Sequence, residues 1–265
     1  MSTFEQLLRE ADARPLVGWD LSCDGRITTT ATPWNFEAAV VRHARRSPDM
    51  LDMGTGGGEW LSQLAHRPAR TVATEGWVPN VAVARERLVP LGVEVVEVEG
   101  ADDNATQGGE DQAQLPFADA SFHLVVNRHE SFVASDVHRI LVAGGRFVTQ
   151  QVASDFNADA YALLDLRMPA LPRWQLDTAV GQLTRAGLVI EQGEEGAEVL
   201  SFDDIGAFAW YLKHVPYVCP EFTIDRCRVA LERLHERIQD SGPLAMRQKL
   251  FWLEAVKRSK TLTEG

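Results

Sequence analysis

The sequence predicts an α/β fold whose sheet is doubly wound and mostly parallel. An apolar run at residues 50–53 is followed by alternating glycines and then by helical spacing, which indicates a strand, a tight loop and a helix. A second strand pattern ends in Glu75, 21 positions after Gly54. Strand and helix patterns then alternate as far as residue 152. A chain of 265 residues has room for one large domain, or for one domain with an added cap.

Two helices are expected before the glycine loop. Residues 2–13 show the spacing of a short amphipathic helix. Thr32-Pro33 predicts the start of a second helix, because a capping side chain precedes a proline. Trp19 and Trp34 lie near this start, and they either close the top of the sheet or face a ligand.

Residues 52–58 form the glycine loop and predict a ligand cradle. Glycine allows the sharp turn and lets the backbone approach a ligand without a Cβ atom in the way. The first N–H groups of the following helix are then expected to face the ligand. Structural turns also collect glycine, so the loop alone is weak evidence. The candidate binding residues here are Asp52, Gly54, Thr55, Gly56 and Gly58.

The second predicted strand, at residues 71–74, ends in Glu75-Gly76-Trp77. Glu75 has nearly the spacing at which a carboxylate accepts both hydroxyls of an adenosine ribose; the alternative is a surface glutamate. Glu59 stands where a dinucleotide fingerprint has its third glycine. A carboxylate there would repel a pyrophosphate, which favours a cofactor without phosphate.

The middle of the chain continues the alternation. Residues 93–98 predict a third strand, and residues 99–114 form a loop in which Asp102 or Asp103 is placed to accept a hydrogen bond from an adenine amino group. Strands are expected at residues 123–127 and 146–152. The helix between them is expected to end at Gly144-Gly145.

The C-terminal third is less regular. Helices are expected at residues 175–186 and 202–214, and a third helix is expected to be capped by Thr223. Strands are expected at residues 188–192 and 250–256.

Composition excludes several classes of function. The net charge is −12, from 38 acidic and 26 basic residues, which argues against nucleic acid as a partner. No apolar run approaches the roughly 20 residues of a membrane span, and the start is acidic, unlike a signal peptide. The three cysteines do not form a disulfide framework, and no side-chain set has metal-ligand spacing. We therefore expect a cytoplasmic protein without a metal.

The motifs together resemble the class I S-adenosylmethionine-dependent methyltransferases. The segments that carry this resemblance are residues 52–58, Glu75, residues 115–122 and residues 138–147. Residues 73–77, 127–131, 149–152 and 211–216 are similar to a bacterial small-molecule subgroup of unknown substrate. The loop at residues 101–114 is longer than usual in the family. The resemblance implies a Rossmann-like sheet of seven mostly parallel strands with an antiparallel last strand, N-terminal helices and a C-terminal helical cap.

The resemblance also implies the cofactor S-adenosyl-L-methionine. The residues expected to bind it are Asp52, Gly54, Thr55, Gly56, Gly58, Glu75, Gly76, Trp77, Asp102, Asp103, Asn127 and Arg128. The expected domains are an N-terminal helical lid (1–48), a cofactor-binding core (49–200), a helical cap (201–243) and a final strand (244–265). The residues expected to bind substrate are Trp19, Trp34, Glu130, Gln151, Tyr211 and Tyr217.

The implied reaction is methyl transfer to an oxygen or nitrogen of a small molecule, by a monomer or homodimer. Alignment of the reactants supplies about 7–11 kcal/mol in such reactions. A base helps to remove a proton from the acceptor, and His129 and His214 are the candidates. Alternatively, His129 and Glu130 bond to loop backbone or bind the methionine part of the cofactor, and His214 belongs to the core of the cap.

Two other functions remain open on the sequence alone. An RNA or protein methyltransferase would present a basic face beside the donor pocket. Instead, the chain has no lysine or arginine between Arg87 and Arg128. A non-catalytic partner protein would keep the fold and bind another chain through an exposed apolar patch.

Overall fold

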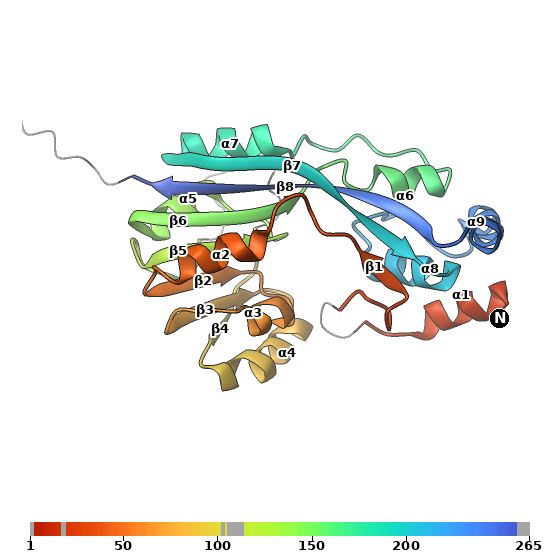
Figure 1. Ribbon diagram of the computed structural model, residues 1–265, viewed down its shortest axis with the longest axis horizontal. Coiled ribbons are helices and arrows are strands. Elements are labelled where there is room, and N and C mark those ends of the chain that lie inside the picture. The colour runs from red at the N-terminus through yellow and green to blue at the C-terminus, as the bar shows by residue number, and fades with distance from the viewer. Residues whose placement is uncertain (1–2, 17–19, 102–103, 105–113, 259–265) are drawn as a thin grey trace, which may run out of the picture. The chain divides into compact units, whose positions relative to one another are not determined.

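The computed structural model describes residues 3–16, 20–101, 104 and 114–258. Contacts divide the chain into two units, whose elements are labelled in Figure 1. Unit 1 consists of Met1–Pro33, Ser154–Leu171 and Gly196–Leu250. Unit 2 consists of Trp34–Ala153, Pro172–Glu195 and Phe251–Gly265. Three residues predicted to bind ligands, Trp19, Asp102 and Asp103, lie outside the described residues.

Unit 2 is built around parallel strands. These are β2 (Asp49–Met53), β3 (Arg70–Glu75), β4 (Glu94–Glu97), β5 (Phe122–Arg128) and β6 (Leu141–Val152). β2 pairs in parallel with β3 and β5, while β3 pairs with β4 and β5 pairs with β6 in the same sense. β2 is buried along its whole length, as expected for a parallel strand covered on both faces. The carboxyl ends of these strands therefore meet at one edge, where open α/β sheets bind ligands.

Within the described part of the chain, the sheet has eight strands in the order β1-β7-β8-β6-β5-β2-β3-β4, so the expectation of seven strands is wrong. The extra strand, β1 (Ile27–Thr29), pairs antiparallel with β7 (Leu188–Phe202). Three residues are too few to show strand periodicity. β7 begins in unit 2 and ends in unit 1, whereas its neighbour β8 (Leu244–Lys257) begins in unit 1 and ends in unit 2. The two strands consequently run in opposite directions, as Figure 1 shows.

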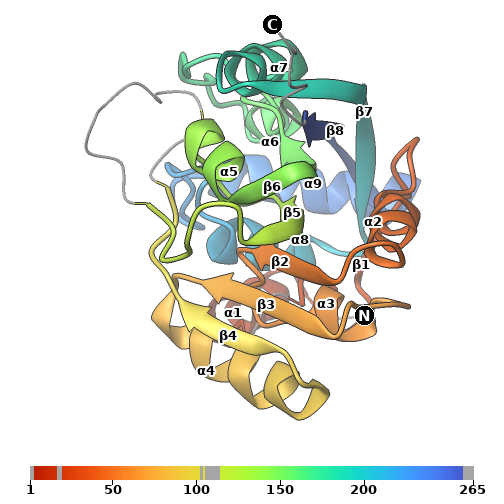
Figure 2. The ribbon, with the colours of Figure 1, turned by 90° about the vertical axis from the view of Figure 1, so that its left-hand side faces the viewer.

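Helices flank the parallel strands of unit 2. They are α2 (Phe36–Ala44), α3 (Glu59–Gln63), α4 (Val78–Leu88), the 3-10 turn η1 (Val89–Leu91), α5 (Ala134–Ile140) and α7 (Leu176–Arg185). α2 and α5 both contact β6 and lie on opposite sides of the sheet (Figure 2). On the side of α5 and α7, the core contains ring contacts of Phe132 with Phe147 (5.0 Å) and with Trp174 (5.8 Å). These rings fix the two helices against the sheet.

Two helix boundaries in unit 2 differ from the prediction. α2 begins at Phe36 instead of Thr32-Pro33, because the side chain of Asn35 accepts a hydrogen bond from Ala38 N and acts as the cap. α5 ends at Ile140, so Gly144-Gly145 lie inside β6 and do not end the helix. Gly144 takes a left-handed φ of 79° there, and only glycine adopts this conformation readily.

Unit 1 contains α1 (Phe4–Ala13), α6 (Ala158–Leu163), α8 (Ile205–His214) and α9 (Arg228–Ser241). α8 contacts both α1 and α9 and is buried almost throughout. The cap of α9 is Cys227 and not Thr223, whose hydroxyl accepts from Arg226 N in a turn that precedes the helix.

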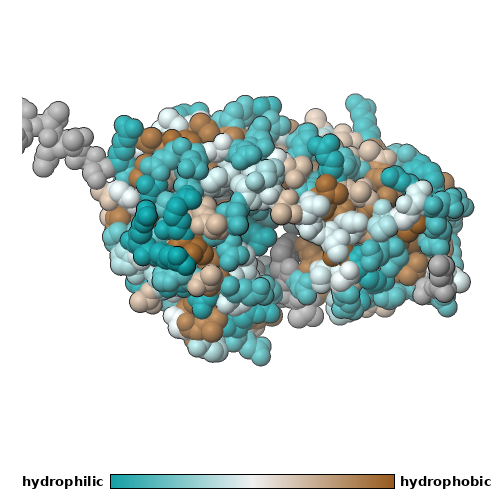
Figure 3. Space-filling view, viewed as in Figure 1, coloured by the Kyte–Doolittle hydropathy of each residue, from teal (hydrophilic) through white to brown (hydrophobic). Residues whose placement is uncertain are grey.

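On the face drawn in Figure 3, apolar residues are scattered among polar ones. Among the described residues, no helix is long and apolar enough to cross a membrane.

Candidate functional site

The glycine loop has the backbone conformation that its sequence predicts. Gly54, Gly56 and Gly58 have φ values of 69°, 63° and 78°, in the left-handed region that other residues avoid. Several loop N–H groups are used within the protein: Gly54 donates to Thr74 Oγ1 (3.2 Å), and Thr55 donates to the carbonyl oxygen of Thr74 (2.8 Å). The loop is therefore held against the end of β3.

Glu75 connects the glycine loop to the next strand. Its Oε2 accepts a hydrogen bond from Gly56 N (2.7 Å), and its Oε1 accepts one from Trp77 N (2.9 Å). Burial raises the pKa of Glu75, while the N–H groups of Trp77 and Gly56 oppose this rise. Each carboxylate oxygen still has a lone pair for a further donor. Glu75 thus has the position and the acceptor capacity that binding of ribose hydroxyls requires.

Glu59 does not stand as an isolated charge near the loop. Its carboxylate forms an ion pair with Arg87, whose guanidinium also donates to the carbonyl oxygen of Gly57. This pairing weakens the argument that Glu59 repels a pyrophosphate, since Arg87 offsets its charge. Glu59 therefore does not by itself disfavour a ligand that carries phosphate.

A pocket that is open to solvent lies where the carboxyl ends of the strands meet. Of the residues predicted to bind ligands, Gly54, Glu75, Gly76 and Glu130 line it. The lining also includes residues that were not among the predicted binding residues: Met53, Thr74, Val98, Glu99, Gly100, Ala101, Leu115, Ser131, Phe132, Val133 and Asp136.

Glu130 lies between two glycines of the pocket wall. A Cβ atom built at Gly54 would lie 2.5 Å from the Cβ of Glu130, and one built at Gly100 would lie 2.1 Å from its Oε1. At Gly54, which also has a left-handed φ, a side chain would meet the fixed Cβ of Glu130, so glycine is required there; at Gly100 it would meet only the mobile carboxylate end.

The acids around the pocket are perturbed by burial. Burial raises the pKa of Asp52 to about 7, and the Glu75 carboxylate adds to this rise while Arg128 opposes it. Burial and the Glu75 carboxylate raise the pKa of Glu130 to about 7. Of the described lining residues, four are acidic and none is a lysine, arginine or histidine. The pocket is thus suited to a ligand that carries positive charge.

Asn127 and Gln151 form a buried amide network behind the pocket wall. Asn127 Oδ1 accepts hydrogen bonds from Gln151 Nε2 (2.5 Å) and Thr149 Oγ1 (2.8 Å). Gln151 Nε2 also donates to the carbonyl oxygen of Glu130 (3.0 Å), which holds the loop after β5 in place. Neither amide lines the pocket, so their predicted contacts with cofactor and substrate stay predictions. Arg128 is exposed at the end of β5, and Trp77 has 53% of its surface exposed at the start of α4.

His129 belongs to a chain of hydrogen bonds that begins at Trp34. The indole Nε1 of Trp34 donates to Gln150 Oε1 (2.7 Å), and Gln150 Nε2 lies 2.9 Å from His129 Nε2. The backbone N–H of His129 also donates to the carbonyl oxygen of Gln150 (2.8 Å). His129 has a left-handed φ of 63°. His129 is exposed, and the pKa of its ring is lowered by desolvation and by the neighbouring Arg128 guanidinium, which favours the neutral form.

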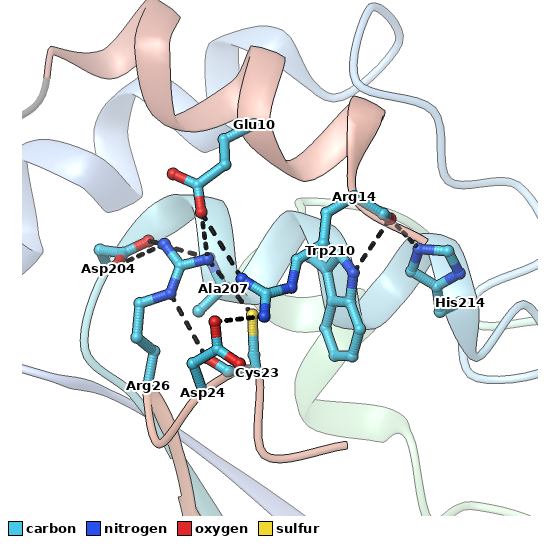
Figure 4. Close-up of polar contacts among 9 residues, drawn as sticks. All are labelled: Glu10, Arg14, Cys23, Asp24, Arg26, Asp204, Ala207, Trp210 and His214. Carbon is cyan, nitrogen blue, oxygen red and sulfur yellow. Dashed lines mark hydrogen bonds and ion pairs between the residues drawn. The ribbon is translucent and has the colours of Figure 1, made fainter. Parts of the chain in front are cut away.

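The other predicted residues belong to unit 1. His214 Nε2 donates to the backbone carbonyl of Arg14 (2.8 Å), which also accepts from Trp210 Nε1 (3.2 Å; Figure 4). Tyr211 is buried and its hydroxyl accepts from Gln248 Nε2 (2.7 Å). Tyr217 is 52% exposed. A catalytic role for His214 and substrate contacts for the two tyrosines stay predictions, as do the lid and cap roles of residues 1–48 and 201–243.

The described residues contain no group of three or more His, Cys, Asp or Glu side chains placed to hold a metal ion.

Comparisons with known proteins agree with this arrangement. Residues 51–149 match the model of a methyltransferase domain, which supports a methyltransferase domain at the glycine loop and the strands that follow it. No curated protein matches the sequence.

Solved structures show the same fold at low sequence identity. A protein from Bacillus halodurans, provisionally named a methyltransferase, is 19% identical, with a TM-score of 0.57 over 84% of this chain and 99% of its own. The YcgJ protein from Bacillus subtilis is 18% identical, with a TM-score of 0.56 over 84% of this chain and 98% of its own. A third structure, described by the conversion of a disulfide bond into a thioacetal group during echinomycin biosynthesis, is 14% identical. Its TM-score is 0.53 over 94% of this chain and 88% of its own.

Proposed function

We propose that the chain is an S-adenosylmethionine-dependent methyltransferase that acts on an oxygen or nitrogen of a small molecule. The observation that carries this proposal is the pocket at the ends of β2, β3 and β4, where the glycine loop meets Glu75 and Glu130. The match of residues 51–149 to a methyltransferase domain supports it.

The charge of the pocket favours a sulfonium cofactor over a dinucleotide. With four acidic and no basic residues in its described lining, the pocket offers nothing to balance a pyrophosphate. Glu75 would accept the ribose hydroxyls, and Glu130 would face positive charge. S-adenosylmethionine, when bound, supplies a methyl group on a positively charged sulfur.

The protein's own contribution is then mainly to bind and orient. The backbone of the loop and the fixed carboxylate of Glu75 restrict where a nucleoside can lie. Orientation of two reactants is worth about 7–11 kcal/mol when the geometry is favourable. The assignment of His129 or His214 as a base is a separate question, because methyl transfer needs few catalytic side chains.

The first test is calorimetric titration with S-adenosylmethionine and with its demethylated product, S-adenosylhomocysteine. Glu75→Ala removes the acceptor of the ribose hydroxyls, and hydrogen bonds to a charged group contribute about 1.5–3 kcal/mol each. We expect the affinity for both compounds to fall about 100-fold.

Glu97→Ala is the matched control. Glu97 is the register partner of Glu75 on β4, but it is exposed and lies 3.8 Å from Arg85. The Glu97→Ala variant should bind both compounds as tightly as the wild type does. Absence of binding to the wild-type protein, or equal affinity after Glu75→Ala, would contradict the proposal.

A further inference from the structure

The hydrogen bonds at Gln150 determine which nitrogen of His129 carries the proton. The indole N–H of Trp34 can only donate, so the Gln150 oxygen must face it. The amide nitrogen of Gln150 then faces His129 Nε2, and an amide NH₂ group also can only donate. His129 Nε2 must therefore accept. A neutral imidazole has one accepting and one donating nitrogen, so the proton lies on Nδ1.

The bond between Trp34 and Gln150 is buried, whereas His129 itself is exposed. Trp34 and Gln150 are 7% and 5% exposed, so water does not readily replace their mutual hydrogen bond. The backbone bond from His129 N to the carbonyl oxygen of Gln150 holds the histidine next to the amide. A doubly protonated ring would place an N–H of His129 against an N–H of Gln150.

We propose that Trp34 and Gln150 are positioning residues that hold His129 as the Nδ1–H tautomer, so that its Nε2 is occupied by the bond from Gln150 and is not free to remove a proton. The tautomer follows from the hydrogen bonds alone. Its consequence for catalysis rests on the proposed methyl transfer. A base at Nε2 would have to break the bond from Gln150 before it accepted a proton.

The test is an NMR measurement of the tautomer in the full-length protein with ¹⁵N-labelled histidine. Long-range ¹H–¹⁵N correlations distinguish a protonated Nδ1 from a protonated Nε2, and the signals of His129 are those lost in His129→Asn. We expect Nδ1–H in the wild type at pH 7. A protonated Nε2, or protons on both nitrogens, would overturn the proposal.

Gln150→Glu keeps the shape of the side chain almost unchanged but should reverse the tautomer of His129. A carboxylate only accepts, so it can keep the bond from Trp34 but requires His129 Nε2 to donate. We expect His129 to switch to the Nε2–H form or to the doubly protonated form. A His129 that stays in the Nδ1–H form would show that Gln150 does not set the tautomer.

Trp34→Phe tests the hydrogen bond from Trp34 to Gln150, and it does so even if Gln150→Glu folds poorly. Without the indole N–H, the amide can turn, so both tautomers of His129 should appear. The matched control is Trp252→Phe. Trp252 stacks on Trp34 at 6.5 Å between ring centroids, and its Nε1 has no hydrogen-bond partner among the described residues. This variant should keep Nδ1–H. A pure Nδ1–H form in Trp34→Phe would remove Trp34 from the proposal.

Titration of wild-type protein with S-adenosylhomocysteine separates this inference from the proposed function. Protein that shows the Nδ1–H form but binds no S-adenosylhomocysteine would refute the function and leave the tautomer assignment intact. Protein that binds the compound but shows the Nε2–H form would refute the tautomer assignment alone.

Discussion

Glu130 lies in the wall of the pocket, and its charge changes near neutral pH. Its side chain lies between Gly54 and Gly100, and burial and Glu75 raise its pKa to about 7. An unfolded glutamate has a pKa of about 4.3. Between these values the folded protein binds more protons than the unfolded chain, so its stability falls as the pH rises. This contribution is complete below the unfolded pKa and is lost as the pH passes the folded pKa.

We therefore predict that the ligand-free protein becomes less stable from about pH 4.5 to about pH 7, and that Glu130→Gln reduces this decline. Part of the decline should remain in Glu130→Gln, because the pKa of Asp52 is also about 7. Urea unfolding at several pH values measures the effect. Glu37→Gln, an exposed glutamate on α2, is the control and should decline as the wild type does. Parallel stability curves for the wild type and Glu130→Gln would contradict the prediction.

Among the structural elements, the junction of α3 and α4 depends on one missing side chain. Gly58 caps α3 with a φ of 78°, and a Cβ atom there would lie 2.8 Å from the side chain of Leu88, which is fully buried at the end of α4. Gly92 has the same φ, but a Cβ atom there would meet nothing within 4 Å. The two glycines share a backbone conformation and differ in packing.

Alanine substitutions at these glycines separate the two effects. Both should lose about 1–2 kcal/mol from the left-handed backbone. Gly58→Ala should lose a further ~1–3 kcal/mol, because the added methyl group overpacks Leu88. Urea unfolding of both variants measures the difference in the free energy of unfolding. Equal losses would mean that Leu88 moves aside at no cost, and that the contact between α3 and α4 does not require glycine.

The same elements show how far sequence alone can predict. The glycine loop and Glu75 were predictable because their conformation and hydrogen bonds depend on a few neighbouring residues. β1 was not, because a three-residue strand exists only through pairing with β7 far along the chain. Asp136 was not predicted to line the pocket, because it belongs to α5 and does not lie at the end of a strand. The link from Trp34 to His129 likewise joins residues that no local pattern connects.

For the whole molecule, charge separates the proposed small-molecule function from action on RNA. The net charge of −12 repels a polyanion, and the described pocket lining adds four acids without a basic residue. Binding to nucleic acid relies on lysine and arginine at the phosphates, with an affinity that falls as salt rises.

We predict that the protein binds no RNA measurably at about 150 mM salt, and that a hundred-fold excess of RNA leaves its affinity for S-adenosylhomocysteine unchanged. Fluorescence anisotropy with labelled single-stranded and double-stranded RNA measures the first point, and calorimetry in the presence of RNA measures the second. Glu130→Gln, which removes one acid from the pocket, should also fail to bind, since one charge in twelve does not reverse the repulsion. Salt-sensitive RNA binding by the wild type would instead favour an RNA methyltransferase and would point to a local basic surface that the net charge conceals.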